Sequence, residues 1–252
     1  MSNPFDLTGK VALVTGGNVG LGQGIALALA EAGADIVSVA LSESDDTVAK
    51  VQAMGRRAHA ISADLTSIEP VERVVQETLA AMGRIDILVN NAGLIRRADA
   101  VDFTEADWDL VMNINLKTVF FMSQAVARLF IKQGEGGKII NIASMLSFQG
   151  GIRVPSYTAS KSGVAGLTKL MANEWAPHRI TANAIAPGYF ATANTQALRE
   201  DPVRSAEILG RIPAGRWGEP SDLGGAAVFL ASRASDYVQG AILPVDGGWQ
   251  AR

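Results

Sequence analysis

The chain has 252 residues, 48% of them hydrophobic and 19% charged, with a formal net charge of −3 at pH 7. This composition is ordinary for a soluble globular protein, and it argues against disorder and, without a basic stripe, against a nucleic-acid partner. Because the chain has no cysteine and only two histidines, His59 and His178, we expect no disulfide, no thiol chemistry and no transition-metal site.

The amino-terminal sequence MSNPFDLTGKVALVTGG has no basic segment followed by an apolar stretch, so it does not read as a secretory signal. No apolar run approaches the roughly 18 residues needed to cross a bilayer. These features predict a cytoplasmic protein without a membrane partner.

Short runs rich in β-branched residues alternate along the chain with amphipathic helical patterns. These runs predict strands at residues 10–16, 34–40, 57–63, 85–93, 137–144, 180–188 and 241–248. Helices are predicted at Gly22–Ala32, Pro70–Met82, Glu105–Lys132, Ser156–Ala176 and Ser221–Ser232. Alternation with right-handed crossovers predicts a parallel seven-stranded sheet covered on both faces, a three-layer doubly wound α/β fold of the Rossmann type.

A closed eight-stranded barrel would show the same alternation, but seven strands and a glycine-rich first turn favour the open sheet. No linker or repeat divides the chain, so a single domain is expected over residues 1–252. The irregular segment 188–218, rich in Gly, Pro and Arg, is expected to cover the substrate as a lid.

The first turn has the sequence TGGNVGLG, from Thr15 to Gly22, and opens a helix. Glycines let backbone amides approach a pyrophosphate, whose charge the helix amino terminus attracts. The G-x-G-x-x-G spacing is absent, because Ile25 stands where its third glycine would be. A tight turn without a ligand remains the alternative here, as does a purely structural polar turn for NNAG at Asn90 to Gly93.

Tyr157 and Lys161 lie four residues apart in YTASK, so a helix would place both side chains on one face. Alone, such a pair is most simply an exposed aromatic and cation. A phenol has a pKa near about 10, and a neighbouring cation favours its ionised form. Lys161 is therefore predicted to lower the pKa of Tyr157 toward the range of acid-base catalysis.

With TGGNVGLG, NNAG, a serine ending the fifth strand, YTASK and APG in this order, the chain resembles the short-chain dehydrogenase/reductase family over its whole length. The resemblance implies a catalytic set made of Asn115, Ser144, Tyr157 and Lys161, with Asn113 as the alternative asparagine. Ser144 would hydrogen-bond the substrate oxygen, and Asn115 would position a water behind Lys161. Lys161 would also bind the nicotinamide ribose.

The resemblance also implies a dinucleotide site, with Asp64 at the adenine. Its predicted residues are Gly16, Asn18, Val19, Gly20, Leu21, Ser42, Asp64, Leu65, Asn91, Ala92, Gly93, Tyr157, Lys161, Pro187, Gly188 and Thr192. Neither Val19 nor the segment 40–44 is basic, so NAD is favoured over NADP as the cofactor, although Ala40 replaces the aspartate typical of NAD users.

Several segments closely resemble a subgroup of this family that acts on sugar acids in hexuronate and pectin breakdown, which implies a small anionic substrate and a homotetramer. Arginines that could grip a carboxylate are Arg96 and Arg153, and also Arg97 and Arg216, which have an equal claim to be surface ion pairs. The predicted substrate-binding residues are Arg96, Ser144, Met145, Gln149, Arg153, Tyr189 and Trp249, with Asn194 and Gln196 as further candidates for sugar hydroxyls.

Two of these residues have other interpretations. Met145 could be core packing, and Trp249 could be buried in a subunit interface. At the level of function, the alternatives are a 3-oxoacyl-carrier-protein reductase, which would need basic determinants for NADP and for its acidic carrier, and a non-catalytic dinucleotide sensor. The intact set of Asn115, Ser144, Tyr157 and Lys161 argues against a sensor, since a pure binder has no use for a tuned phenol.

Overall fold

Seven parallel strands form the central sheet of the computed structural model, which describes residues 3–251. The strands are β1 (Val11–Thr15), β2 (Asp35–Ala40), β3 (Ala58–Ser62), β4 (Ile87–Asn90), β5 (Gly137–Ile142), β6 (Ile180–Pro187) and β7 (Ile242–Val245). Their order across the sheet is β3-β2-β1-β4-β5-β6-β7. The reversal between β1 and β4 is the point at which doubly wound sheets bind their ligands, so the predicted open α/β fold is confirmed.

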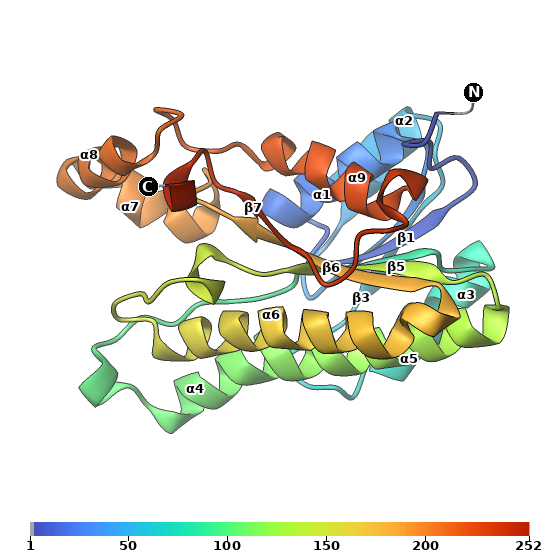
Figure 1. Cartoon of the computed structure of the whole chain (residues 1–252), viewed down its shortest axis with the longest axis horizontal. Helices are drawn as coiled ribbons and strands as arrows, with labels where there is room; N and C mark the ends of the chain where they lie inside the picture. The colour runs from blue at the N-terminus through green and yellow to red at the C-terminus, as the bar shows by residue number, and fades with distance from the viewer. Residues whose placement is uncertain (1–2, 252) are drawn as a thin grey trace.

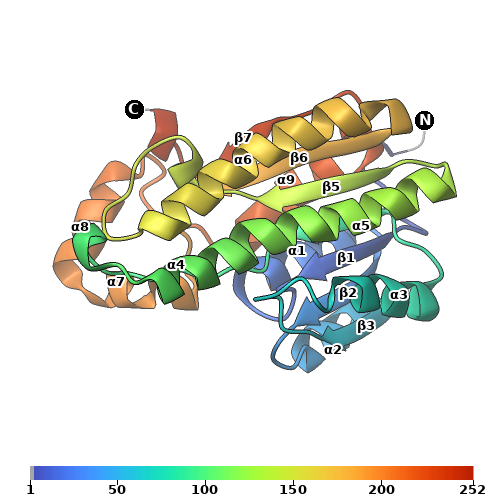
Figure 2. The same cartoon turned by 90° about the horizontal axis from the view of Figure 1, so that it is seen from below.

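Helices cover both faces of the sheet (Figure 1, Figure 2). One face carries α1 (Gly20–Glu31), α2 (Asp45–Ala53) and α9 (Gly224–Ala231). The other carries α3 (Val71–Met82), α4 (Glu105–Met112), α5 (Thr118–Gln133) and α6 (Pro155–Trp175). Two short helices, α7 (Gln196–Glu200) and α8 (Pro202–Arg211), lie beyond the sheet at one end of the molecule.

The first strand shows why the sheet is covered twice. Val11 and Leu13 belong to the apolar cluster under α3, α5 and α6, whereas Ala12 and Val14 belong to the cluster under α1 and α9. Successive side chains of a strand point to opposite faces, so a continuous apolar run requires a core on each side. The uninterrupted apolar pattern of the strand therefore specifies a three-layer arrangement.

Three differences from the predicted elements have physical causes. Helix α2 is absent from the prediction because its sequence DDTVAKVQA is mostly polar and buries only Thr47 and Val51. The predicted helix 105–132 contains a π-helical turn, Asn113–Lys117, between α4 and α5. The segment 188–218, expected to be irregular, contains the two helices α7 and α8. Helix α8 begins at Pro202, and the Asp201 side chain caps it by accepting hydrogen bonds from two backbone N–H groups.

The expectation that no segment has the length and hydropathy of a membrane span needs correction. Within residues 3–251, the continuous helix Glu105–Gln133 meets both criteria over an 18-residue window, of which 44% is buried. The core helix of a globular domain passes the same test, and Val119, Met122, Val126 and Phe130 of this helix are buried against the sheet. The helix is weak evidence for a membrane span.

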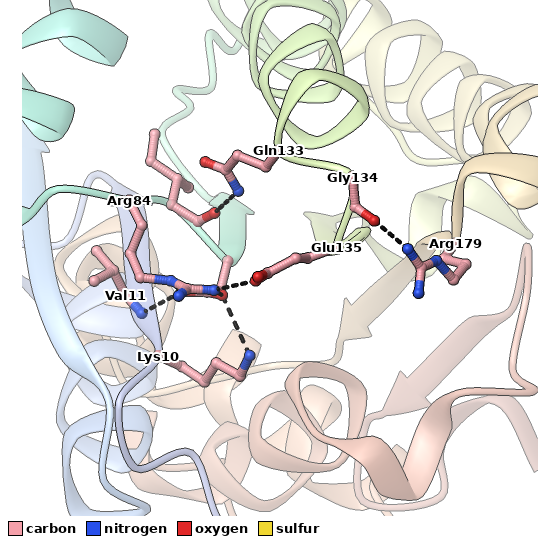
Figure 3. A network of polar contacts seen from close by, with 9 residues as sticks. Lys10, Val11, Arg84, Gln133, Gly134, Glu135 and Arg179 are labelled. Atoms are coloured by element: carbon pink, nitrogen blue, oxygen red, sulfur yellow. Dashed lines mark hydrogen bonds and ion pairs between the residues drawn. The ribbon is translucent and has the colours of Figure 1, made fainter.

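A polar network ties together the amino-terminal ends of the strands, at the edge opposite α7 and α8 (Figure 3). Asp86, only 8% exposed, accepts hydrogen bonds from the Val11 amide at 3.0 Å and from two nitrogens of Arg84 at 2.8 and 2.6 Å. Lys10 Nζ lies 3.3 Å from the same carboxylate, and Arg84 also bonds Glu135. One carboxylate thus connects β1, β4 and the loop before β5.

Asp86→Ala is expected to lower the free energy of unfolding by about 2 kcal/mol, because the buried Val11 amide and the Arg84 guanidinium both lose their acceptor. In thermal unfolding this corresponds to a decrease in Tm of roughly 4–8 °C for a chain of this size. Glu77→Gln, which removes an exposed pair with Arg73, is the control and should cost less than about 0.5 kcal/mol. Equal Tm values for the two variants would contradict the structural role of Asp86.

Candidate active site

A cleft of about 450 Å³ opens at the carboxyl-terminal ends of the strands. The helices α7 and α8 lie at the same end of the sheet (Figure 2). Its lining comes from the turns after β1, β2, β3 and β4, from α6, and from the segment after β6. All predicted cofactor residues except Pro187 and Gly188 line it. The lining residues that were not predicted to bind the cofactor are Gly22, Val39, Ala40, Leu41, Ala63, Thr66, Leu94, Ile114, Ile142, Ala193 and Asn194. Of these, Asn194 was a candidate for sugar hydroxyls.

The glycine turn at Thr15 to Gly22 forms one wall of this cleft. A Cβ on Gly22 would lie 2.0 Å from the Gly16 carbonyl oxygen, and one on Gly16 would lie 2.8 Å from the Asn91 amide nitrogen. Helix α1 starts at Gly20 without a side-chain cap and has no acidic residue in its first turn. Its first N–H groups have no partner within the helix, which suits an anionic group.

The NNAG segment is fastened to the glycine turn. The Thr15 hydroxyl oxygen accepts hydrogen bonds from the backbone amides of Asn91 and Ala92, both at 3.0 Å. Asn91 Nδ2 donates to the carbonyls of Thr15 and Gly16. Asn90 instead points into the core, where it donates to the side chains of Ser123 and Asn141 rather than to backbone groups. Both turns therefore form one rigid cradle.

Tyr157, in the first turn of α6, stands beside Ser144 at the end of β5. Burial raises the pKa of the Tyr157 phenol above its ordinary value, while a hydrogen bond with the Ser144 side chain and the charge of Arg97 both act to lower it. Ser144 also accepts a hydrogen bond from the Leu146 amide at 3.1 Å. The hydroxyl pair can present a proton and a hydrogen bond to one substrate oxygen.

Lys161 lies one turn further along α6 and is 4% exposed. Its Nζ donates to the Ile142 carbonyl oxygen at 2.6 Å and lies 5.7 Å from the centre of the Tyr157 ring. Burial lowers the pKa of this ammonium to about 8. The group is therefore a cation at neutral pH that can lose its proton within the physiological range.

The prediction that Lys161 lowers the pKa of Tyr157 is wrong for this geometry. The first cause acting on the phenol is its own burial, which raises the pKa, and the groups that oppose it are Ser144 and Arg97. The ammonium is directed to the Ile142 carbonyl rather than to the hydroxyl. Helical spacing placed the two residues on one face, as predicted, but it does not determine where the long lysine side chain points.

Asn115 lies in the π-helical turn and is fully buried. Its Oδ1 accepts from the Leu94 amide, and its Nδ2 donates to the Leu94 carbonyl and to Ser160 Oγ. Its described contacts thus clamp the segment after NNAG against α6, and the predicted water behind Lys161 stays a prediction. Asn113, the alternative, is half-buried, and neither asparagine is among the lining residues of the cleft.

Two residues predicted at the nicotinamide, Pro187 and Gly188, lie at the end of β6 outside the cleft lining. The Gly188 amide donates to the Val245 carbonyl oxygen at 2.9 Å, so the end of β6 pairs with β7. A Cβ on Gly188 would lie 2.6 Å from the Asp246 Cα, which makes this a site of close backbone packing. Neither Pro187 nor Gly188 is in the lining, whereas Thr192 is.

Most of the arginines considered for a carboxylate already have partners. Arg96 lies 3.2 Å from Asp107, Arg153 lies 3.0 Å from Asp99, and Arg216 forms a two-point pair with Asp222. Arg97 differs, since its described contact is one hydrogen bond of 3.3 Å to the Asn194 carbonyl oxygen. The sequence could not show these pairings, because the carboxylates that pair with Arg96 and Arg153 follow no recognisable spacing.

The predicted substrate residues Met145 and Trp249 are buried in an apolar cluster with Ile208 and Ile212 of the α8 segment. Tyr189 packs on Trp249 with ring centres 4.8 Å apart. Gln149 accepts hydrogen bonds from Trp249 and Gln250, both at 3.3 Å, and Gln196 donates to Glu200. Met145 thus follows the core-packing interpretation, and Trp249 is buried by its own chain.

No group of three or more His, Cys, Asp or Glu side chains in the described part of the chain is arranged to hold a metal ion. The positively charged lining of the cleft consists of Lys161 alone within residues 3–251, and Asp64 is its acidic member. The Asp64 carboxylate accepts from both the amide and the hydroxyl of Thr66, which lowers its pKa. A cleft of this kind suits a mostly neutral, extended ligand with one anionic group at the glycine turn.

Comparisons with known proteins agree with this geometry. A family model described as enoyl-(acyl carrier protein) reductase matches residues 16–250. A 2-dehydro-3-deoxy-D-gluconate 5-dehydrogenase of Dickeya dadantii (strain 3937) is 66% identical over 250 residues, which are 99% of each chain. A crystal structure from Agrobacterium tumefaciens, described as a candidate 2-deoxy-D-gluconate 3-dehydrogenase with bound NADP, has a TM-score of 0.94 and 57% identity and covers 100% of both chains.

A second crystal structure, a gluconate 5-dehydrogenase from Burkholderia cenocepacia J2315 in complex with NADP and tartrate, has a TM-score of 0.94. It is 43% identical and covers 99% of this chain and 98% of its own. Relatives of this length and identity share the whole domain, including the cleft. Both of these crystal structures contain NADP.

Proposed function

This chain belongs to the short-chain dehydrogenase/reductase family, and we propose that it is an NAD(H)-dependent oxidoreductase that interconverts 2-dehydro-3-deoxy-D-gluconate and 3-deoxy-D-glycero-2,5-hexodiulosonate. The pathway would be hexuronate and pectin breakdown. The observation that carries the redox assignment is the Ser144–Tyr157 hydroxyl pair beside a cleft in which Gly16 and Gly22 leave no room for a side chain. The 66% identity to a sugar-acid dehydrogenase supports the substrate class.

The cleft fits a dinucleotide. Gly16, Gly20 and Gly22 would hold the pyrophosphate at the open end of α1, and Asn91 to Gly93 would hold the adenosine ribose. Lys161 and Thr192 would hold the nicotinamide half, and Asp64 the adenine. When bound, the reduced nicotinamide supplies the hydride that converts the ketone carbon into a carbinol carbon.

The residues of the chain then handle the proton. Tyr157 donates its hydroxyl proton to the carbonyl oxygen in the reduction and accepts it back in the oxidation. The phenol is protonated at neutral pH and can therefore act as the acid in the reduction, while the Ser144 hydrogen bond opposes the rise in its pKa that burial causes. Ser144 donates a hydrogen bond to the same oxygen as negative charge develops there. Asn115 holds Leu94 and α6 in place, and a water beside it would return the proton to Tyr157.

The cofactor preference rests on the turn after β2. Ser42 accepts a hydrogen bond from Asn18 at 2.8 Å, and Leu41 and Val19 are exposed and apolar. No arginine stands in the described lining to pair with a 2′-phosphate, which supports NAD. The NADP in related structures makes NADP the alternative.

Arg97 is proposed to bind the substrate carboxylate in place of Arg96 and Arg153. Its charge reaches Tyr157, and its guanidinium is joined to the protein by one long hydrogen bond. Arg97→Gln is expected to lower kcat/KM for a sugar acid by about 10²-fold, the value of a two-point charge-assisted contact. For an uncharged ketone of similar size, kcat/KM should change less than about threefold by the same estimate.

Arg96→Gln shows whether Arg97 or Arg96 binds the substrate carboxylate. Because Arg96 is already paired with Asp107, its substitution should lower kcat/KM less than Arg97→Gln does. Steady-state kinetics with both substrates would check the prediction. A larger loss of kcat/KM for Arg96→Gln than for Arg97→Gln would show that Arg96, which the sequence favoured, binds the carboxylate.

The function itself is tested with a panel of ketones assayed with NADH and NADPH. The panel holds 3-deoxy-D-glycero-2,5-hexodiulosonate, 5-keto-D-gluconate and 3-oxoacyl thioesters. The proposal requires the highest kcat/KM for the hexodiulosonate with NADH. Preference for acyl thioesters with NADPH would support a 3-oxoacyl-carrier-protein reductase instead, and dinucleotide binding without any turnover would support a sensor.

The segment 188–218 is proposed to act as the lid of this site, and the active form is proposed to be a cytoplasmic homotetramer. Half-exposed apolar side chains on α4, α5 and α6, namely Trp108, Ile131 and Leu170, support a self-association surface on that face.

A further inference from the structure

The residues 246–251, named here the strap, run from the end of β7 across the lid. Asp246 builds the strap, because its carboxylate accepts from the amides of Gly248 at 2.9 Å and Gln250 at 2.8 Å. The Gly247 carbonyl accepts from the Ala214 amide at 2.9 Å, just beyond α8. Both ends of the strap are thus fixed, and Trp249 projects from it into the apolar cluster.

Trp249 is 5% exposed and contacts three segments that are distant in the chain. On one side, its indole N–H donates to Gln149 Oε1, which also receives the Gln250 side-chain amide. Gln149 ends the segment that starts at Ser144, and its own amide donates to the Met145 carbonyl. The strap therefore holds the loop that carries the catalytic serine.

The lid is held through the same ring. The Arg211 guanidinium carbon lies 3.9 Å from the centre of the Trp249 ring, a cation–π contact at the last residue of α8. Ile208 and Ile212 of the same segment pack in the cluster around it. Tyr189, which follows the end of β6, packs on the ring at 4.8 Å.

We propose that Trp249 is a positioning residue, which aligns Ser144 through Gln149 and fixes the lid helix α8 through Arg211. It is not a contact to the substrate. This inference rests on the proposed function, because it concerns the same site. A hydrogen-bond donor displaced from the reacting oxygen loses its effect in the transition state, so a change in the strap appears in kcat rather than in KM.

The test is a double-mutant cycle with Trp249→Phe and Gln149→Leu. Phenylalanine keeps the packing on Tyr189 and Arg211 but removes the N–H, and leucine removes the acceptor. Each variant is expected to lower kcat about tenfold at unchanged KM and dinucleotide Kd. The double variant should lower kcat no further than Gln149→Leu alone, because both substitutions break the Trp249–Gln149 hydrogen bond and Gln149→Leu already removes the acceptor of the Gln250 amide as well. Gln149→Glu keeps an acceptor oxygen and should recover kcat to within about threefold of the wild type.

Trp217→Phe is the matched control, since Trp217 packs on the other side of Tyr189 with ring centres 5.6 Å apart. It should change kcat less than about twofold. The proposal is overturned if Trp249→Phe behaves like this control. It is also overturned if Gln149→Leu raises KM for the sugar acid and leaves kcat intact, and if the fold-changes of Gln149→Leu and Trp249→Phe multiply in the double variant. Those results are the behaviour of a direct substrate contact.

Hydrogen exchange separates these results from a failure of the proposed function. Trp249→Ala should speed exchange in both 145–149 and 202–211 while Trp217→Phe speeds neither, whichever substrate the enzyme uses. If the wild type reduces no sugar acid, this measurement still decides the role of Trp249. Protection that persists in both segments would refute it.

Discussion

Replacement of Tyr157 with phenylalanine is expected to lower kcat by about 10³-fold, because the variant lacks the hydroxyl that donates a proton to the substrate oxygen held by Ser144. The ring would still pack in the first turn of α6, and the glycine cradle would be unchanged. Dinucleotide binding, measured by the fluorescence of the reduced nicotinamide, should therefore keep its Kd within about threefold. Stopped-flow or steady-state absorbance at the nicotinamide band measures the loss of turnover.

Ser144→Ala is the companion variant for this experiment. It removes the hydrogen bond that lowers the pKa of Tyr157, so the phenol becomes a weaker acid and the substrate oxygen loses one donor. Its kcat should fall by about 10²-fold, the usual cost of one donor to a developing oxyanion. Near-normal turnover of a folded Tyr157→Phe enzyme would reject acid catalysis by the phenol.

Lys161→Met is expected to lower kcat/KM by about 10²-fold and to change its pH dependence. Burial lowers the pKa of Lys161 to about 8, so the wild-type residue is cationic below that pH and neutral above it. The phenol does not share this transition, because burial raises its pKa. In the wild type, the rate of ketone reduction should therefore fall as the pH rises through about 8, and this limb should be missing in Lys161→Met.

Lys169→Met, at an exposed position two turns further along α6, is the matched control and should keep the wild-type profile. The profile is best measured as kcat/KM from pH 6 to 10, since this constant reports groups of the free enzyme. If the fall in kcat/KM near pH 8 persists in Lys161→Met, another group titrates there and the buried Lys161 ammonium is not its cause.

Much of the candidate site was predictable from residues close together in the chain. Gly16, Gly20 and Gly22 can be recognised because a turn that brings backbone close to a ligand disfavours side chains. The structure shows the collisions that a Cβ would cause at Gly16 and Gly22, whereas Gly20 is required by its positive φ of 57°. Tyr157 and Lys161 share a face because the helix repeat places residues four apart together. Contacts between distant segments followed no such rule, and the pairing of Arg96 with Asp107 and of Arg153 with Asp99 was not predictable for that reason.

The sequence by itself determined the parallel sheet, its two covered faces and the glycine-lined cleft, because strand burial, helix periodicity and the steric demands of glycine act over a few neighbouring residues. Only the tertiary structure decided which of the four candidate arginines has no described carboxylate partner, and that burial raises the pKa of Tyr157 where a lowering by Lys161 was expected. It also decided that Trp249 meets Gln149, one hundred positions earlier in the chain. Ion pairing, desolvation and packing depend on what the fold brings together, and no local pattern records it.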